Sequence, residues 1–145
     1  MNVVLDGSAA LTILLPDERG GKAAPSILNA LNEAEEIHVP AHWWVEVANG
    51  VLMAERRSRL TQAESATALE DAHELEPATD RESGARITRD ALALARLHSL
   101  TAYDAAYLEL AMRQKARLAT MDTALRHAAL KAGVAIIPAS SHKVS

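Results

Sequence analysis

Apolar residues recur along the chain in two patterns. Short runs in which nearly every residue is apolar, such as VVL near the start and VAII near the end, alternate with longer segments of helical spacing. Uniformly apolar runs are typical of strands buried on both faces, as in a parallel sheet. The expected strands are 2–6, 37–40, 116–122 and 134–138; another within 74–80 is weakened by Pro77.

The longer segments predict helices with recognisable ends. Ser8 is the expected N-cap of the first helix, and Pro40 lies near the first turn of another. Thr61 and Thr101 each precede an acid by three residues, the spacing of a capping box, and Gly133 suits a helix C-terminus. The expected helices are 8–18, 24–34, 40–57, 60–75, 87–99, 102–114 and 123–133. The fold class is therefore α/β, with a short central parallel sheet flanked by helices on both faces.

Composition narrows the class of protein. A chain of 145 residues with 49% hydrophobic residues suits one folded domain, 1–145, and the tail 139–145 is expected to fray. No apolar run reaches membrane-spanning length and no leader is recognisable, so a cytoplasmic protein without a membrane partner is expected. The absence of cysteine excludes disulfides and thiolate zinc sites, and the six histidines contain no H-x-x-x-H pair.

Charge is distributed unevenly. The net charge is −4, but residues 1–77 hold 13 acids against 5 Lys and Arg, whereas residues 78–145 hold 6 acids against 10. Such a chain can present a basic face, although solvated helix surface explains the same counts. Four aromatic residues (Trp43, Trp44, Tyr103 and Tyr107) are too few for a base-stacking platform of the OB or RRM kind.

Three acids fall where an open α/β sheet binds its ligands. Asp6 and Asp122 follow expected strands, and Asp104 begins an expected helix. Ligands of such sheets bind beyond the carboxyl ends of the strands, where helices begin. Helix capping accounts for each acid separately, so both interpretations stay open.

Glu46 is harder to explain as a cap. In the stretch WWVEVANGVLM only Glu46 and Asn49 are strongly polar, and their spacing puts them on one face of a helix that is apolar elsewhere. A buried carboxylate must be paired, protonated or bound to a metal ion. An ion pair with an arginine is the alternative to a metal site.

Four converging carboxylates would repel one another unless a cation lies between them. All-oxygen ligands favour Mg²⁺ or Mn²⁺, and such ions support phosphodiester hydrolysis. Ser8 and Thr120, each two residues from an acid, could hold a carboxylate or a water molecule, and Asn49 could do so from the Glu46 face.

Four segments in order, VVLDGSAAL, VPAHWWVEVANGVL, LTAYDAAYLELA and LATMDTAL, resemble the PIN-domain family, in particular the VapC-type toxins of bacterial toxin–antitoxin pairs. The resemblance covers nearly the whole chain. It implies that the acidic quartet of the family corresponds to Asp6, Glu46, Asp104 and Asp122, as catalytic residues and metal ligands. It also implies a Mg²⁺- or Mn²⁺-dependent endoribonuclease that forms a homodimer and is inhibited by a cognate antitoxin.

One departure from the family pattern is Gly7, where Ala or Thr is more usual, and a looser turn is expected there. A receiver-like phosphoacceptor domain and a haloacid-dehalogenase-type phosphatase fit less well, because Gly7 and Ser8 stand where each would need a second acid. A catalytically inactive PIN-like interaction module is the serious alternative. Arg56, Arg57 and Arg59 either follow RNA phosphates or form solvated surface.

Overall fold

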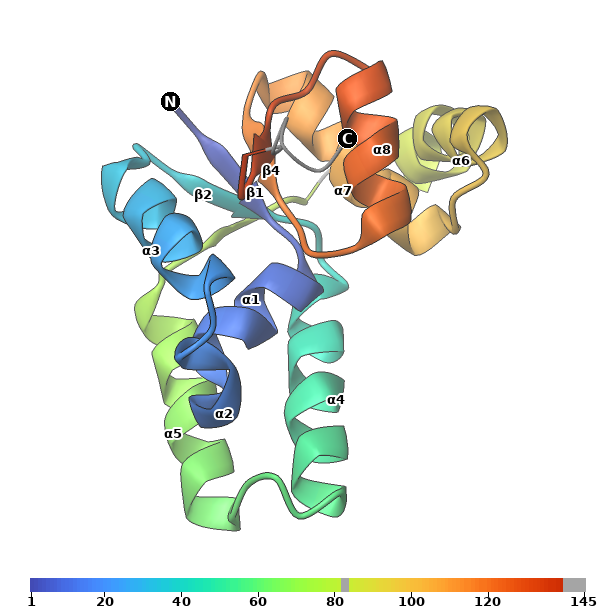
Figure 1. The fold of residues 1–145 in the computed structure, drawn as a ribbon. Helices are drawn as coiled ribbons and strands as arrows, with labels where there is room; N and C mark the ends of the chain where they lie inside the picture. The colour runs from blue at the N-terminus through green and yellow to red at the C-terminus, as the bar shows by residue number, and fades with distance from the viewer. Residues whose placement is uncertain (82–83, 140–145) are drawn as a thin grey trace.

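A five-stranded parallel sheet lies at the centre of the computed structural model, which describes residues 1–81 and 84–139 (Figure 1). Its strand order is β3-β2-β1-β4-β5, so the first strand pairs with both β2 and β4. All three residues of β1 are fully buried, as the uniformly apolar pattern predicts. The strands are β1 Val3–Leu5, β2 Ile37–Val39, β3 Ala78–Thr79, β4 Arg117–Ala119 and β5 Ile136–Ile137.

Helices cover both faces of this sheet. The chain adds β2 and β3 on one side of β1, and β4 and β5 on the other. Because connections between parallel strands are right-handed, the helices of these two halves lie on opposite faces of the sheet. One helix, α7, packs against β1, β2 and β4. The α/β class is therefore confirmed. The helices are α1 Gly7–Leu14, α2 Pro16–Arg19, α3 Ala23–Glu33, α4 Trp43–Arg56, α5 Gln62–Glu74, the π-helix η1 Arg86–Ala91, α6 Leu92–His98, α7 Ala102–Gln114 and α8 Thr123–Lys131.

Several predicted helix ends are correct. Thr61 and Glu64 form a complete capping box at the start of α5, and the Thr101 hydroxyl accepts a hydrogen bond from the backbone N–H of Asp104 at 3.1 Å. Gly133 follows α8 with a φ of +80°, the left-handed conformation expected at that position. The weak prediction of a strand within 74–80 is confirmed by β3, which lies at the edge of the sheet where Pro77 is tolerated.

Other boundaries were wrong. Asp6 rather than Ser8 is the N-cap of α1. Pro16 does not extend that helix but begins α2, because proline lacks an N–H and suits a first helical position. The fourth helix begins at Trp43 rather than near Pro40, and the segment expected as one helix over 87–99 divides into η1 and α6. Residues 140–145 of the tail lie outside the described residues.

Within residues 1–81 and 84–139, no helix has the length and apolar composition that crossing a membrane requires.

Candidate metal and catalytic site

Asp6 lies at the carboxyl end of the central strand and is held by three donors. Its side chain is only 3% exposed. One carboxylate oxygen accepts hydrogen bonds from the Ser8 hydroxyl at 2.7 Å and from the backbone N–H of Ala9 at 2.8 Å. The other accepts a short hydrogen bond from the Thr120 hydroxyl. These contacts fix the position of the carboxylate, and they give Ser8 and Thr120 the supporting contact that their spacing suggested.

The register of the sheet explains why Asp6 meets Thr120. Leu5 pairs with Ala119 across the parallel β1–β4 ladder, so the next residue on each strand emerges at the same edge. The backbone N–H of Asp6 continues the ladder to the carbonyl of Ala119 at 3.0 Å. Two residues 114 positions apart are thereby brought into hydrogen-bond contact.

Glu46 reaches the same edge from the first turn of α4. Its carboxylate accepts a short hydrogen bond from the hydroxyl of Tyr107, so its partner is a tyrosine rather than the arginine considered above. Gly7 allows this approach, since a Cβ there would lie 3.1 Å from Oε1 and 3.3 Å from Cβ of Glu46. The expected looser turn at Gly7 is therefore wrong, because this residue is the first of α1 and packs closely against Glu46.

Asp104 and Asp122 are both at helix starts, as the capping interpretation requires. Asp122 is the N-cap of α8 and accepts from the backbone N–H of Leu125 at 3.4 Å. Its own N–H donates to the Thr120 hydroxyl at 3.0 Å, which links it to the group around Asp6. Asp104 lies in the first turn of α7.

Charge interactions link Asp104 with each of the other three acids. The pKa of Asp6 is raised from 3.8 to about 6, chiefly by burial. Its three hydrogen bonds lower this pKa, and the charge of Asp104 raises it by a smaller amount. The pKa of Asp104 is also raised, first by burial and then by the negative charges of Asp122 and Glu46. Capping and electrostatic repulsion are therefore compatible, since Asp104 and Asp122 lie at helix starts and Asp122 raises the pKa of Asp104.

Burial, followed by contact with the Glu46 carboxylate, raises the pKa of Tyr107 far above its usual value. The phenol therefore stays protonated and remains a donor to Glu46. The sequence did not assign this role to Tyr107, although its position three residues after Asp104, on the same side of one helix, was a usable indication.

Carboxylate oxygens that repel one another match the ligand chemistry of a hard divalent cation. The positions of these side chains support a metal site less well than their chemistry does. In the parts of the chain that the structure describes, no three His, Cys, Asp or Glu side chains are arranged so that they could hold a metal ion. The oxygens of Asp6 accept hydrogen bonds from Ser8, Ala9 and Thr120, and one oxygen of Glu46 accepts a hydrogen bond from Tyr107.

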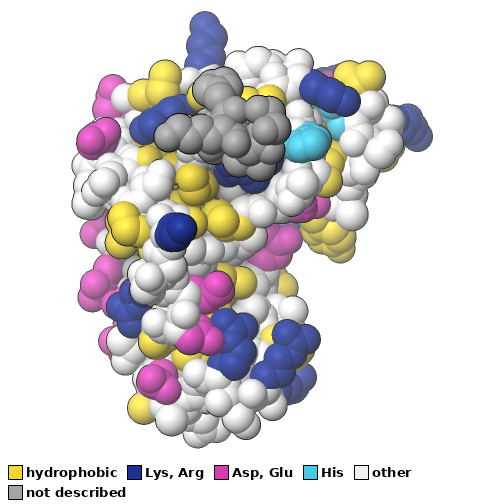
Figure 2. All heavy atoms as spheres, viewed as in Figure 1, with side chains coloured by type: hydrophobic (Ala, Val, Ile, Leu, Met, Phe, Trp, Pro, Cys, Tyr) yellow, Lys and Arg dark blue, Asp and Glu magenta, His cyan; other side chains and the backbone are white. Residues whose placement is uncertain are grey.

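The other candidate residues lie away from this group. Asn49 is exposed, so the expectation that α4 is buried nearly all round is wrong. Arg56 ends α4, about 15 Å along the helix axis from Glu46 at ~1.5 Å per residue. Figure 2 shows basic side chains gathered at this end of α4, on the face turned to the viewer. Arg57 is exposed there, and Arg59 is paired with Asp17 at 2.7 Å.

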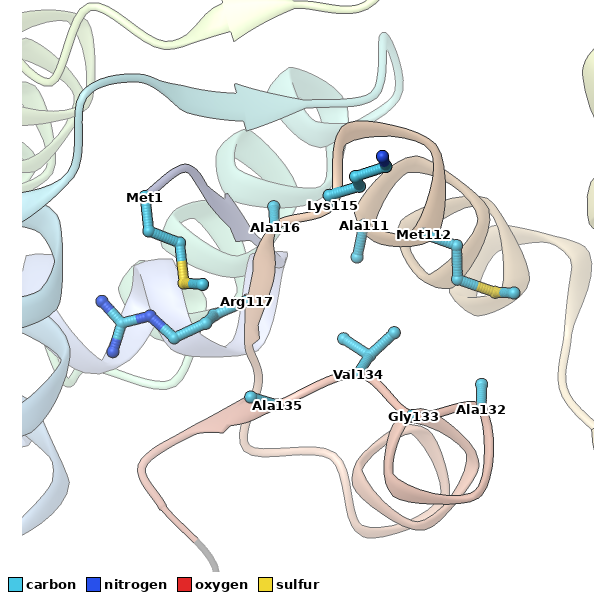
Figure 3. A pocket seen from close by; sticks show the side chains of 10 residues that line it. All are labelled: Met1, Ala111, Met112, Lys115, Ala116, Arg117, Ala132, Gly133, Val134 and Ala135. Atoms are coloured by element: carbon cyan, nitrogen blue, oxygen red, sulfur yellow. The ribbon is translucent and has the colours of Figure 1, made fainter.

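A separate cavity of about 400 Å³ lies at the opposite, amino edge of the sheet (Figure 3). Lys115 and Arg117 are its basic lining residues, and Val134 points into it. None of the four acids lines this cavity.

Comparison with known proteins agrees with the fold. The PIN domain family model matches residues 3–131. Ribonuclease VapC3 from Pyrobaculum aerophilum is 36% identical over 125 residues, which cover 86% of this chain and 92% of that protein.

Two crystal structures share the fold. PAE2754 from Pyrobaculum aerophilum superposes with a TM-score of 0.66 at 18% identity, over 88% of this chain and 79% of that one. FitAcB from Neisseria gonorrhoeae superposes with a TM-score of 0.58 at 20% identity, over 93% of this chain and 96% of that one. The family match and the close relative confirm what the four sequence segments indicated: this chain belongs to the PIN-domain family.

Proposed function

We propose that this protein is a metal-dependent endoribonuclease toxin that hydrolyses RNA phosphodiester bonds and is neutralised by a cognate antitoxin. One observation supports the proposal: the charge of Asp104 raises the pKa of Asp6, and the charges of Asp122 and Glu46 raise that of Asp104, at the carboxyl edge of the sheet. The relationship to a protein named ribonuclease VapC3 supports RNA as the substrate. Because the proposed substrate is cellular RNA, the proposal implies action in the cytoplasm.

The proposed ligand set is Asp6, Glu46, Asp104 and Asp122, which would hold Mg²⁺ or Mn²⁺. Such an ion, when bound, supplies polarisation of the phosphate and a water of lowered pKa. The protein's own contribution is orientation. Ser8 and Thr120 hold the Asp6 carboxylate, and Tyr107 holds that of Glu46. Both acids are thereby placed before substrate arrives, which lowers the cost of organising the site during the reaction.

RNA cleavage by the partner-free protein tests this proposal. Structured RNA should be cut with Mg²⁺ or Mn²⁺ and left intact in EDTA, with 5′-phosphate and 3′-hydroxyl ends. Glu46→Gln should lower the rate roughly 100-fold or more, the scale seen when one transition-state electrostatic group is lost. Glu55→Gln, on the same helix, is the matched control. Cleavage that persists in EDTA and leaves cyclic phosphates would contradict the metal mechanism.

A catalytically inactive interaction module is the second candidate. It is favoured by one observation: among the described residues, no three His, Cys, Asp or Glu side chains are arranged to hold a metal ion. Calorimetric titration with Mn²⁺ separates the two. The nuclease proposal expects binding that Glu46→Gln weakens and Glu55→Gln leaves unchanged. Absence of binding and of cleavage, in a protein that still associates with its partner, would favour the module.

The antitoxin proposal has its own test. Expression of this chain alone should arrest growth, and co-expression of a small gene from its genomic neighbourhood should relieve the arrest. Growth arrest that no neighbouring gene relieves would count against the toxin–antitoxin assignment.

We also propose that the protein forms a homodimer, as the family resemblance implies. The apolar stretch 105–111 of α7 is buried in the protein core, so it leaves no spare apolar face. Exposed apolar side chains occur instead beside a cavity of about 470 Å³ between α6 and α7, where Leu97 is 74% exposed and Met112 43%. Leu97→Glu should shift a dimer towards monomer in light scattering, and a monomeric wild type at tens of micromolar would contradict the proposal.

A further inference from the structure

A small cavity opens beside the acidic group, at the same edge of the sheet. Its volume is about 240 Å³, and its lining is mainly apolar. It lies among the segment after β2, the residue after β3, η1 and the start of α7. The lining residues that matter here are Pro40, His42, Asp80, Ile87, Tyr103 and Ala106.

Aromatic side chains connect this cavity to Glu46. The His42 ring lies edge-on to Tyr103, with centroids 5.5 Å apart and planes at 70°. It meets Tyr107 in the same way at 5.1 Å and 72°, and the Tyr107 hydroxyl donates to Glu46. Tyr103 also directly precedes Asp104 in α7. The cavity and the proposed catalytic acids therefore share a wall.

The wall of the cavity is close to neutral and includes an exposed ring. Tyr103 is 64% exposed, so one ring at the entrance is available for a ligand. Asp80 contributes a carboxylate, but Arg113 donates to both of its oxygens, at 3.1 and 2.7 Å. A flat, weakly polar ligand suits such a surface better than a phosphate, because the described lining residues include no Lys or Arg to bind one.

We propose that this cavity receives one unstacked nucleobase of the RNA, next to the phosphate that is cut, and that Tyr103 stacks on that base. The proposal rests on the ribonuclease function proposed above and adds a subsite to it. When the phosphate to be cut lies at the acids, the RNA has one base on either side of it. Single-stranded bases bind proteins by stacking on aromatic side chains. Tyr103 is thereby a binding and specificity residue, distinct from the acids.

Abasic substrates give a direct test. Short RNA substrates of the wild-type enzyme are remade with a single base missing at each position around the cut. For wild type, loss of one particular base should reduce kcat/KM about 5- to 150-fold, the range for one base–aromatic stack. Tyr103→Ala should cause a similar loss on intact RNA, mainly through KM, because stacking is present before and during the reaction.

The combination of the two changes is the decisive measurement. Tyr103→Ala should show no further loss on the substrate that lacks the critical base, since both changes remove the same contact. Tyr103→Phe keeps the ring and should restore binding. Ala102→Met, which narrows the cavity from its lining, should raise KM. Leu28→Ala removes an exposed apolar side chain on α3 and serves as the control.

Failure of this inference is distinguishable from failure of the ribonuclease proposal. If wild type cuts no RNA, the ribonuclease proposal itself fails. If wild type cuts RNA but Tyr103→Ala is as active as Leu28→Ala, or its effect adds fully to that of every abasic position, the nucleobase subsite is refuted. Unchanged RNA kinetics with weakened antitoxin binding would refute it too, and would assign the cavity to a protein partner.

Discussion

Because the carboxylate of Asp6 is buried, the stability of the metal-free protein should depend on pH. Its pKa rises from 3.8 to about 6 on folding, mainly because of burial. An acid whose pKa is raised by folding stabilises the protein when protonated. That contribution is complete below pH ~3.8 and is lost as the pH rises through ~6. At neutral pH the ionised carboxylate therefore opposes folding.

The rise in pKa from 3.8 to about 6 corresponds to about 3 kcal/mol in the free energy of unfolding, at ~1.36 kcal/mol per unit. Roughly half of this free energy should be lost between pH 5 and pH 7.5. Asp6→Asn removes the titration. Asparagine is as good an N-cap as aspartate, so the hydrogen bond from Ala9 can be kept.

Denaturant unfolding in EDTA, at several pH values from 4 to 8, measures the effect. Asp6→Asn should gain stability relative to wild type as the pH rises, by about 2 kcal/mol between pH 4 and pH 8. For a chain of this length that equals a relative gain of roughly 4–8 °C in Tm. Glu70→Gln, an exposed position on α5, controls for loss of one negative charge. A difference between Asp6→Asn and wild type that stays constant with pH would refute the reasoning.

Three further predictions follow from the site and its surroundings. Asp104→Asn relieves repulsion among the acids, so in EDTA it should melt at the wild-type temperature or higher, gain less from Mn²⁺, and cut RNA at least ~100-fold more slowly; a lower Tm with full activity would leave Asp104 a cap alone. Tyr107→Phe removes the donor to Glu46 and should lower stability by roughly 0.5–1.5 kcal/mol in denaturant unfolding, with a clear loss of cleavage; unchanged activity would show that Glu46 needs no positioning. Arg113→Ala leaves the largely buried carboxylates of Asp80 and Glu109 without their shared partner and should cost about 3–5 kcal/mol, part of which Glu109→Gln in the same chain should restore; thermal melting at the wild-type temperature would contradict this.

Helix starts could be predicted from the sequence, because they depend on residues that are neighbours in the chain. Thr101 and Thr61 mark helix starts because a hydroxyl satisfies a free backbone N–H wherever the helix lies in the protein. The π-helical turn at Arg86–Ala91 was not predictable in this way, since the sequence there has an ordinary helical spacing. The contact between Tyr107 and Glu46 was also missed, because it joins residues 61 positions apart and depends on how α4 and α7 are placed.

Strand order determines how close the acids of the proposed site lie to one another. The sequence could place Asp6, Asp104 and Asp122 at strand and helix ends, but it did not state which strands are neighbours. In the observed order, β1 is central and β2 and β4 flank it. Asp6 therefore follows the middle strand, Glu46 comes from the helix after one neighbour, and Asp122 from the loop after the other. The helix before β4 supplies Asp104. Had β4 paired at the outer edge of β3 instead, Thr120 could not reach Asp6, and the same four acids would lie apart.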